Sequence, residues 1–132
     1  MLATENRKKT SLAIGILNER ENQMFYGRVF VPIFGNGNVV GLYGRRLDDA
    51  DPRHLYLSGS HRGVFNATAA KAHQCLIVTE SIFDTMSPWQ AGYRNAIALY
   101  GKDGWTADHG TLLAESGVTD IVLALDNDAS CA

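Results

Sequence analysis

The sequence has few cysteines and no long apolar run, and each absence excludes a class of protein. Its 132 residues include only two cysteines, Cys75 and Cys131, which are too few for a disulfide framework or a zinc site. No stretch approaches the ~20 apolar residues of a membrane-spanning helix. The N-terminal residues 1–12 lack the apolar core of a signal peptide. We therefore predict a protein of the reducing cytoplasm with no membrane partner.

Lysine is also missing from a long part of the chain, between residues 10 and 70, where arginine supplies the positive charge. Residues 1–66 carry nine Lys and Arg against six Asp and Glu, whereas residues 67–132 carry three against eight. One interpretation is a basic half that holds polyanions beside an acidic half that holds cations. The other interpretation is chance, so the charge distribution alone does not decide the function.

The composition predicts a folded domain, because 45% of the residues are hydrophobic and 20% are charged. A phosphate-binding loop of the Gly-x-x-x-x-Gly-Lys type is absent, which excludes a P-loop NTPase. The first half of the chain has the turn residues and β-branched residues of a hairpin. Its predicted elements are a helix at 5–17, strands at 28–34 and 39–46 joined by a turn at 35–38, and a loop at 47–63 with a short strand at 55–57.

The second half predicts a parallel α/β unit, in which buried strands alternate with helices. Pro88 is expected to kink or interrupt the first of these helices. The boundary between the halves lies near residues 64–74. The predicted elements are buried strands at 75–79, 95–100 and 120–125, and helices at 81–91 and 106–116.

Acidic side chains follow two of these strands. Glu80 comes directly after the first, and Asp126 and Asp128 come after the third. Ligands of open parallel sheets bind at the carboxyl ends of the strands, so we expect the carboxylates to share a crevice if their strands are neighbours. A divalent cation would remove their mutual repulsion, and oxygen ligands on an open site suit Mg²⁺ or Mn²⁺. Asp84, one helical turn after Glu80, either reaches the same rim or is an ordinary first-turn acid.

These motifs resemble the catalytic core of bacterial DnaG-type DNA primases, which contains the TOPRIM metal-binding fold. A TOPRIM domain has a Glu after one strand and an Asp-x-Asp after a later one, and the matching segments read VTESIFD and LALDNDAS. The hairpin before them, with its Gly-Arg at the end of the second strand, is similar to the primase hairpin. The segment DPRHLYLSG is similar to the family's Pro-Lys-Tyr-Leu-Asn element, with Arg53 in place of lysine, and SHRG is similar to a later basic element. The resemblance covers roughly residues 20–132.

The resemblance implies an α/β fold with a TOPRIM-like parallel sheet flanked by helices over residues 67–132, cut short at its C-terminal end. A small mixed or antiparallel β subdomain with an N-terminal helix would precede it over residues 1–66. The implied activity is that of a DNA primase, a nucleotidyltransferase of the DNA-directed RNA polymerase type. Such an enzyme synthesises RNA primers on single-stranded DNA from ribonucleoside triphosphates, and a replicative helicase is a further partner through flanking domains.

The resemblance also implies roles for particular residues. Glu80, Asp126 and Asp128 would be catalytic and would hold Mg²⁺ or Mn²⁺, with Asp84 as a further metal residue. Arginine presents a planar fork that suits phosphate, so the basic half would bind template and nucleotide. The residues predicted to bind nucleic acid or nucleotide are Arg28, Arg45, Arg46, Arg53 and Arg62.

Strand alternation restricts which of these arginines can act together. Along residues 39–46 it predicts that Arg45 and Arg46 face opposite sides, so that only one points at a substrate. Tyr43 and Tyr56, close to arginines, are candidates for stacking on bases. For any single arginine the alternative is a solvated strand edge. The four histidines have no metal-ligand spacing and are predicted to be surface or packing residues.

Departures from the family pattern keep two other functions open. Ser81 stands where the family has Gly after the motif Glu, and Cys131 replaces a later Gly. A further acidic cluster of primases is absent, so the isolated segment would be inactive if those acids hold a second metal. The departures fit a primase of a phage, plasmid or genomic island. The alternatives are a TOPRIM nuclease or topoisomerase-like phosphodiester enzyme, and a non-catalytic nucleic-acid-binding module with a vestigial metal site.

Overall fold

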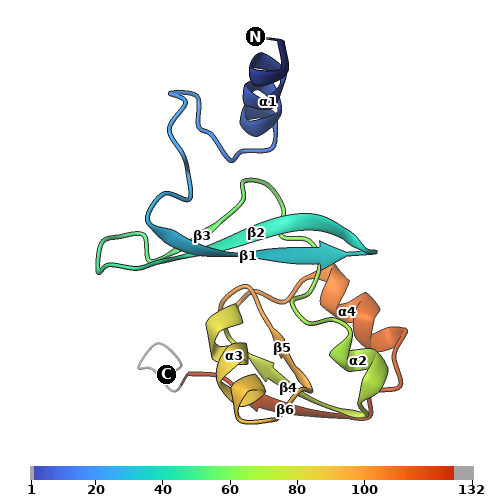
Figure 1. Cartoon of the computed structure of the whole chain (residues 1–132). Coiled ribbons are helices and arrows are strands. Elements are labelled where there is room, and N and C mark those ends of the chain that lie inside the picture. Colours follow the sequence, from blue (N-terminus) through green and yellow to red (C-terminus); the bar gives the residue numbers. More distant parts are fainter. Residues whose placement is uncertain (1, 127–132) are drawn as a thin grey trace.

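The computed structural model describes residues 2–126, with side chains from residue 4 onward. Within this range the chain forms two three-stranded sheets (Figure 1). The first sheet is antiparallel with strand order β1-β2-β3, and the second is parallel with strand order β5-β4-β6. This arrangement confirms the predicted fold class, a parallel sheet with helices preceded by a small antiparallel β subdomain.

The antiparallel sheet is the predicted hairpin with one short strand added. The turn is tight because Asn36 and Gly37 adopt φ angles of 51° and 80°, the left-handed conformations that a two-residue hairpin turn requires. The N-terminal helix ends at Ala13, earlier than predicted, because Gly15 leaves the helical region with a φ of 77°. The elements of this half are α1 (Leu2–Ala13), β1 (Arg28–Gly35), β2 (Asn38–Arg46) and β3 (His54–Tyr56).

The second half confirms the predicted alternation of strands and helices and adds a short helix, α2, before the first strand. The third helix of the chain runs through Pro88 and ends at Gln90, so the predicted interruption there was wrong. Pro88 lies in the last turn of this helix, so its missing N–H removes only the bond to the Asp84 carbonyl, and the helix ends two residues later. The elements are α2 (Ala69–Ala72), β4 (Cys75–Thr79), α3 (Ile82–Gln90), β5 (Ala96–Ala98), α4 (Ala107–Ala114) and β6 (Asp120–Ala124).

Strand β6 differs from its prediction in burial. All five of its residues are exposed, whereas the three residues of β5 are buried. Both β5 and β6 are edge strands of the parallel sheet, but α3 packs against β5 and β4, whereas β6 packs chiefly against β4. Its apolar side chains Ile121, Val122 and Leu123 are 44%, 52% and 65% exposed. An apolar strand sequence therefore predicted the strand correctly but not its burial.

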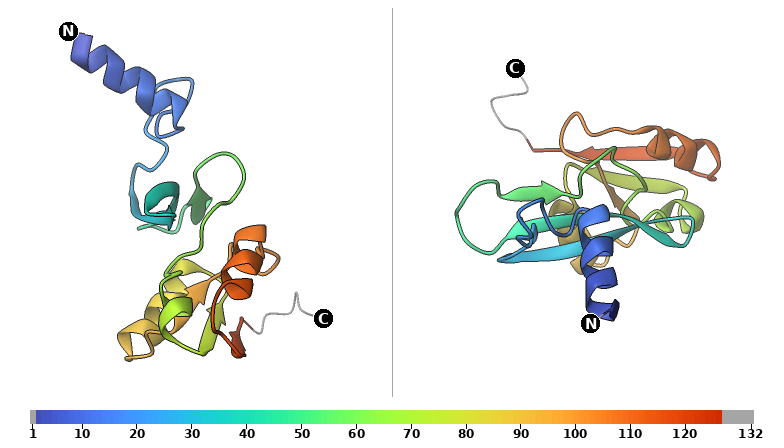
Figure 2. Two further views of the ribbon diagram at one scale, coloured as in Figure 1. Left: turned by 90° about the vertical axis from the view of Figure 1, so that its right-hand side faces the viewer. Right: turned by 90° about the horizontal axis from the view of Figure 1, so that it is seen from above.

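Two apolar clusters form the core. One lies within the second half, where Leu76, Val78 and Ile97 of the parallel sheet pack against Ala69 and Ala70 around α2. The other joins the halves, since it combines Ile33 and Tyr43 of the hairpin with Ile82 and Ala98. The hairpin sheet therefore packs on the parallel unit, while α1 stands apart from both sheets (Figure 2). In the described part of the chain no helix is long and apolar enough to cross a membrane.

Candidate metal and nucleic-acid site

The acidic motifs lie at one end of the parallel sheet. Strands β4 and β6 are parallel neighbours, and Thr79 is paired with Ala124 at their carboxyl ends. Glu80 leaves β4 at this point, and Asp126 follows two residues after the end of β6. Because these strands are parallel and neighbouring strands lie about 4.8 Å apart, both acids emerge at the same end of the sheet. We call this end, with Glu80 and Asp126, the acidic edge. Asp128, the third predicted carboxylate, lies outside the described residues.

The residue after Glu80 explains how α3 begins beside this edge. Ser81 is the N-cap of α3, and its hydroxyl accepts a hydrogen bond from the backbone N–H of Asp84. The same hydroxyl donates to Asp84 Oδ2 at 2.6 Å. Serine caps helices well, because its oxygen satisfies a backbone N–H that has no partner within the helix. Ser81, which departs from the family glycine, therefore fixes both the helix start and the Asp84 carboxylate.

The donor chemistry of this edge fits a hard divalent cation. Glu80, Asp84 and Asp126 supply only carboxylate oxygens, which Mg²⁺ and Mn²⁺ prefer over nitrogen or sulfur. Within the described residues, however, no three His, Cys, Asp or Glu side chains are gathered closely enough to form a ready-made metal site. The structure thus brings Glu80 and Asp126 to one end of the sheet, with Asp84 in the first turn of α3 beside it.

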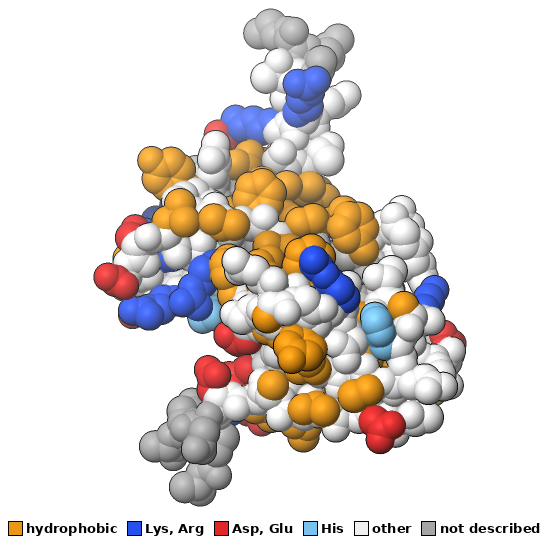
Figure 3. All heavy atoms as spheres, turned by 60° about the horizontal axis from the view of Figure 1, so that its bottom comes forward, with side chains coloured by type: hydrophobic (Ala, Val, Ile, Leu, Met, Phe, Trp, Pro, Cys, Tyr) orange, Lys and Arg blue, Asp and Glu red, His pale blue; other side chains and the backbone are white. Residues whose placement is uncertain are grey.

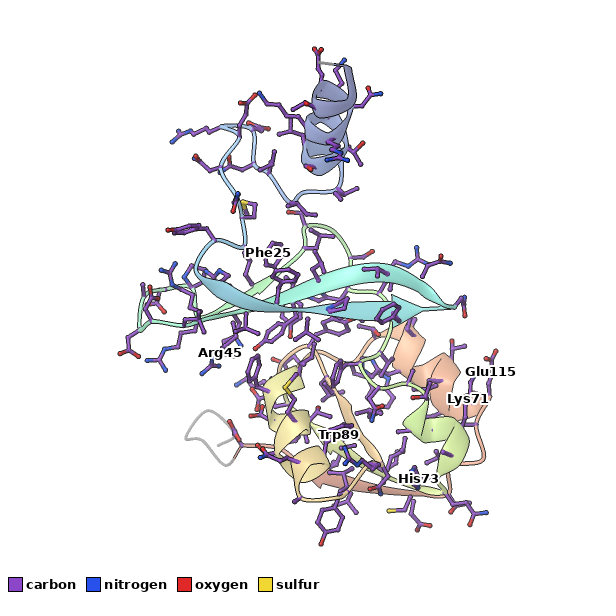
Figure 4. The ribbon with its side chains drawn as sticks, viewed as in Figure 1. Phe25, Arg45, Lys71, His73, Trp89 and Glu115 are labelled. Atoms are coloured by element: carbon purple, nitrogen blue, oxygen red, sulfur yellow. The ribbon has the colours of Figure 1, made fainter. Side chains whose placement is uncertain are left out.

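The hairpin sheet presents Arg45 on the face that packs on α3, the helix that begins beside this acidic edge. In the β2–β3 pair Arg45 lies opposite His54 and Tyr43 lies opposite Tyr56, so all four side chains share one face. That face packs on α3, because the Tyr43 ring lies 5.9 Å from the Phe83 ring. In Figure 3 basic, histidine and acidic side chains follow one another on the surface here. Figure 4 shows Arg45 on this side of the sheet and Phe25 on the other.

Arg46 lies on the opposite face, as strand alternation predicts. It is paired across the hairpin with Arg28, and the two side chains share the face on which Phe25 packs near Gly44. Arg46 donates two hydrogen bonds to the carboxylate of Asp48. These bonds lower the pKa of Asp48 to about 2, so the carboxylate remains ionised and compensates the charge of Arg46.

The remaining predicted arginines have contacts other than those of Arg45. Arg28 donates to the backbone carbonyl of Arg53 at 3.2 Å, and the Arg53 guanidinium lies 3.3 Å from Asp49. Arg62 is exposed on the segment that joins the two sheets. Of the strand arginines, Arg45 is the one that the sheet register directs toward α3.

The two tyrosines proposed to stack on bases serve the core instead. Tyr43 is fully buried, and its ring lies 5.0 Å from the ring of Tyr56. Burial raises the pKa of both hydroxyls, so both tyrosines stay neutral. The prediction that Tyr43 stacks on bases was wrong, because its ring has no free face.

Three residues near the site were missed by sequence reasoning. His54 bridges Tyr43 and Arg45, and Tyr100 donates from its hydroxyl to the carbonyls of Arg62 and Gly63. Asp108 of α4 accepts the backbone N–H of Gly63 at 2.5 Å. Tyr100 and Asp108 thus fix the backbone of the segment that carries Arg62. The hairpin register was a signal for His54, but the contacts of Tyr100 span 37 and 38 residues and leave no local pattern.

Comparison with known proteins agrees with this geometry. Residues 77–130 match a family model described as Toprim-like. The DNA primase of Deinococcus radiodurans is 33% identical over 93% of this chain. A solved DnaG catalytic core superposes with a TM-score of 0.75 at 28% identity, over 96% of this chain and 43% of that one. A DnaG primase catalytic domain bound to single-stranded DNA gives a TM-score of 0.71 at 26% identity, over 89% and 42%.

The chain carries a TOPRIM domain of the DnaG-primase type. The matched segment begins within β4 and includes Glu80, Asp84 and Asp126. The antiparallel sheet in front of this TOPRIM domain is part of the structural match, since the DnaG core covers nearly the whole chain. The chain spans about a quarter of the length of the curated primases that it matches, 24% in the Deinococcus radiodurans protein.

Proposed function

We propose that this chain is part of a DNA primase catalytic core that synthesises RNA primers on single-stranded DNA during replication. In this proposal residues 1–66 form the basic part and residues 67–132 form the TOPRIM part. The observation that carries the proposal is the meeting of two features at one place. The carboxylates of a TOPRIM domain leave β4 and β6 at the edge toward which the hairpin sheet directs Arg45.

The acidic edge would hold the metal. We assign Glu80 and Asp126 as its main ligands together with Asp128, and Asp84 as a supporting carboxylate that Ser81 holds in place. A bound Mg²⁺ supplies Lewis acidity toward phosphate oxygens and lowers the pKa of an attacking 3′-hydroxyl. The carboxylates place negative charge where a cation is needed. Without a cation, their mutual repulsion makes it unfavourable to bring them together in the ionised form.

The basic face would hold the phosphates of template and nucleotide. Arg45 faces the acidic edge and is the candidate to bind the phosphate group nearest the reacting atoms. Arg53 and Arg62 would bind further phosphates along the DNA strand. We propose single-stranded DNA and ribonucleoside triphosphates as the ligands, and a DnaG catalytic domain bound to single-stranded DNA supports the first of them. A helicase would bind through parts of the primase outside this chain.

The test is a synthesis assay with a full-length primase that carries this chain, a single-stranded DNA template, ribonucleoside triphosphates and Mg²⁺. The proposal predicts template-dependent RNA oligomers that disappear with Asp126→Asn, while the circular dichroism spectrum is unchanged. Nicking of a supercoiled plasmid without nucleotides would instead favour a phosphodiester-cleaving TOPRIM enzyme. Template binding without any synthesis would contradict catalysis by this chain and favour a nucleic-acid-binding module.

A further inference from the structure

We propose that His54 is a positioning residue that holds the Arg45 guanidinium in place for a phosphate group of the nucleic acid. This inference rests on the proposed function, because it assumes that Arg45 contacts phosphate. The two residues lie directly opposite each other in the β2–β3 pair, and their side chains project from the same face of the sheet. Arg45 Nη1 lies 2.8 Å from His54 Nε2.

The chemistry of the two partners fixes the direction of every hydrogen bond in this group. A guanidinium can only donate, so His54 Nε2 must be the acceptor and carries no proton. The neutral ring then has its proton on Nδ1, which lies 2.7 Å from the Tyr43 hydroxyl oxygen and donates to it. Tyr43 is fully buried and Arg45 is half-buried, so the chain of bonds runs from the core toward the surface.

The charges around His54 favour the neutral ring that this geometry requires. Burial and the nearby charge of Arg45 lower the pKa of His54, with smaller contributions in the same direction from Arg53 and Arg28. Asp84 acts in the opposite direction but does not outweigh them. An imidazole that stays neutral keeps its acceptor at Nε2 and does not repel Arg45.

In the described part of the chain, the positive charge of Arg45 is not compensated by a nearby aspartate, whereas the charges of Arg46 and Arg53 are. Arg46 and Arg53 each lie within ion-pair distance of an aspartate. Among the described residues no carboxylate lies that close to Arg45, whose guanidinium is hydrogen-bonded to the neutral His54 instead. A guanidinium held by a neutral acceptor keeps its full charge and loses less rotamer freedom when it binds phosphate.

Fluorescence anisotropy with a labelled oligothymidylate measures this positioning directly. Arg45→Ala is expected to weaken binding about tenfold and to reduce the slope of log affinity against log salt by about 0.7, the value for one phosphate contact to a single strand. His54→Phe, which keeps a ring but no nitrogen, should weaken binding about threefold with the slope unchanged, because the charge of Arg45 remains. His54→Gln restores an acceptor and should recover part of the loss.

Two controls separate positioning from a general effect. His73→Phe changes an exposed histidine after α2 (Figure 4), and Arg46→Ala removes the neighbouring charge from the opposite face. Both should change the affinity less than Arg45→Ala. In the double variant Arg45→Ala with His54→Phe, the affinity should equal that of Arg45→Ala alone, since His54 acts through Arg45.

The outcomes distinguish the inference from the function on which it rests. A long-range ¹H–¹⁵N NMR spectrum should show His54 protonated at Nδ1, and protonation at Nε2 would overturn the inference. Additive losses in the double variant, or unchanged binding by His54→Phe while Arg45→Ala weakens it, would also overturn the inference and leave the proposed function standing. Unchanged binding by both single variants would remove Arg45 from the nucleic-acid site.

Discussion

At the scale of single residues, the site depends on side chains that hold other side chains. Ser81 holds Asp84, His54 holds Arg45, and Tyr100 holds the backbone of the Arg62 segment. The charged residues themselves could be predicted from the sequence, because acids after apolar strands and arginines on a hairpin have recognisable patterns. The residues that position them could not, since each acts through a contact made only after the chain has folded.

Ser81→Ala tests the smallest of these contacts. The variant removes the cap of α3, and we expect it to lower the free energy of unfolding by about 1 kcal/mol, the usual cost of losing a serine cap. Urea denaturation followed by circular dichroism measures the change. The matched control is Ser87→Ala, an exposed serine within the same helix, which should stay within about 0.5 kcal/mol of the wild type. Equal effects of the two substitutions would show that Ser81 is not a cap.

At the scale of secondary-structure elements, the arrangement depends on where the hairpin sheet meets the parallel unit. Gly63 lies at this junction with a φ of 77°, and a Cβ atom on it would come within 2.7 Å of the Phe34 carbonyl oxygen. Its N–H is bound by Asp108 and its carbonyl by Tyr100. A side chain at this position would therefore push apart the elements that bring Arg45 and Glu80 to the same side.

Gly63→Ala should destabilise the fold through both the backbone angle and the steric clash. Gly37→Ala is the matched control, because Gly37 has a φ of 80° but a Cβ atom added there would meet nothing within 4 Å. We expect the control to cost about 1 kcal/mol and Gly63→Ala to cost at least about 2 kcal/mol more. Thermal and urea unfolding of the two variants give the comparison. Similar losses in both would mean that the junction tolerates a side chain.

The sequence predicted most elements at this scale, and the failures have physical causes. The strand at 75–79 and the hairpin were predicted nearly residue for residue, because apolar runs and the Asn-Gly turn are local signals. The predicted interruption at Pro88 does not occur. Pro88 lies in the last turn of α3, and the helix ends two residues later at Gln90. The exposure of β6 was not predictable, because it depends on which strands the helices cover once the chain has folded.

At the scale of the whole molecule, the parallel sheet leaves an apolar surface at β6. An edge strand with free hydrogen-bonding groups and exposed apolar side chains tends to pair with another chain. Its side chains include Leu123, which is 65% exposed.

Leu123→Lys should reduce self-association of the chain. A lysine on an edge strand places charge where a second strand would pair. Analytical ultracentrifugation over increasing protein concentration should show oligomers for the wild type and a larger monomer fraction for the variant. Val39→Lys, an exposed apolar position on β2, serves as the control for added charge elsewhere. A wild type that remains monomeric at all concentrations would contradict this account of β6.

A Mn²⁺ titration followed by electron paramagnetic resonance tests whether the carboxyl ends of β4 and β6 form the proposed site for a divalent cation. Glu80→Gln keeps the shape of the side chain but removes its charge, and Glu115→Gln makes the same change at the end of α4 (Figure 4). The account predicts that the wild type and Glu115→Gln remove free Mn²⁺ from solution, whereas Glu80→Gln binds it at least about tenfold more weakly. Identical titration curves for Glu80→Gln and the wild type would contradict it.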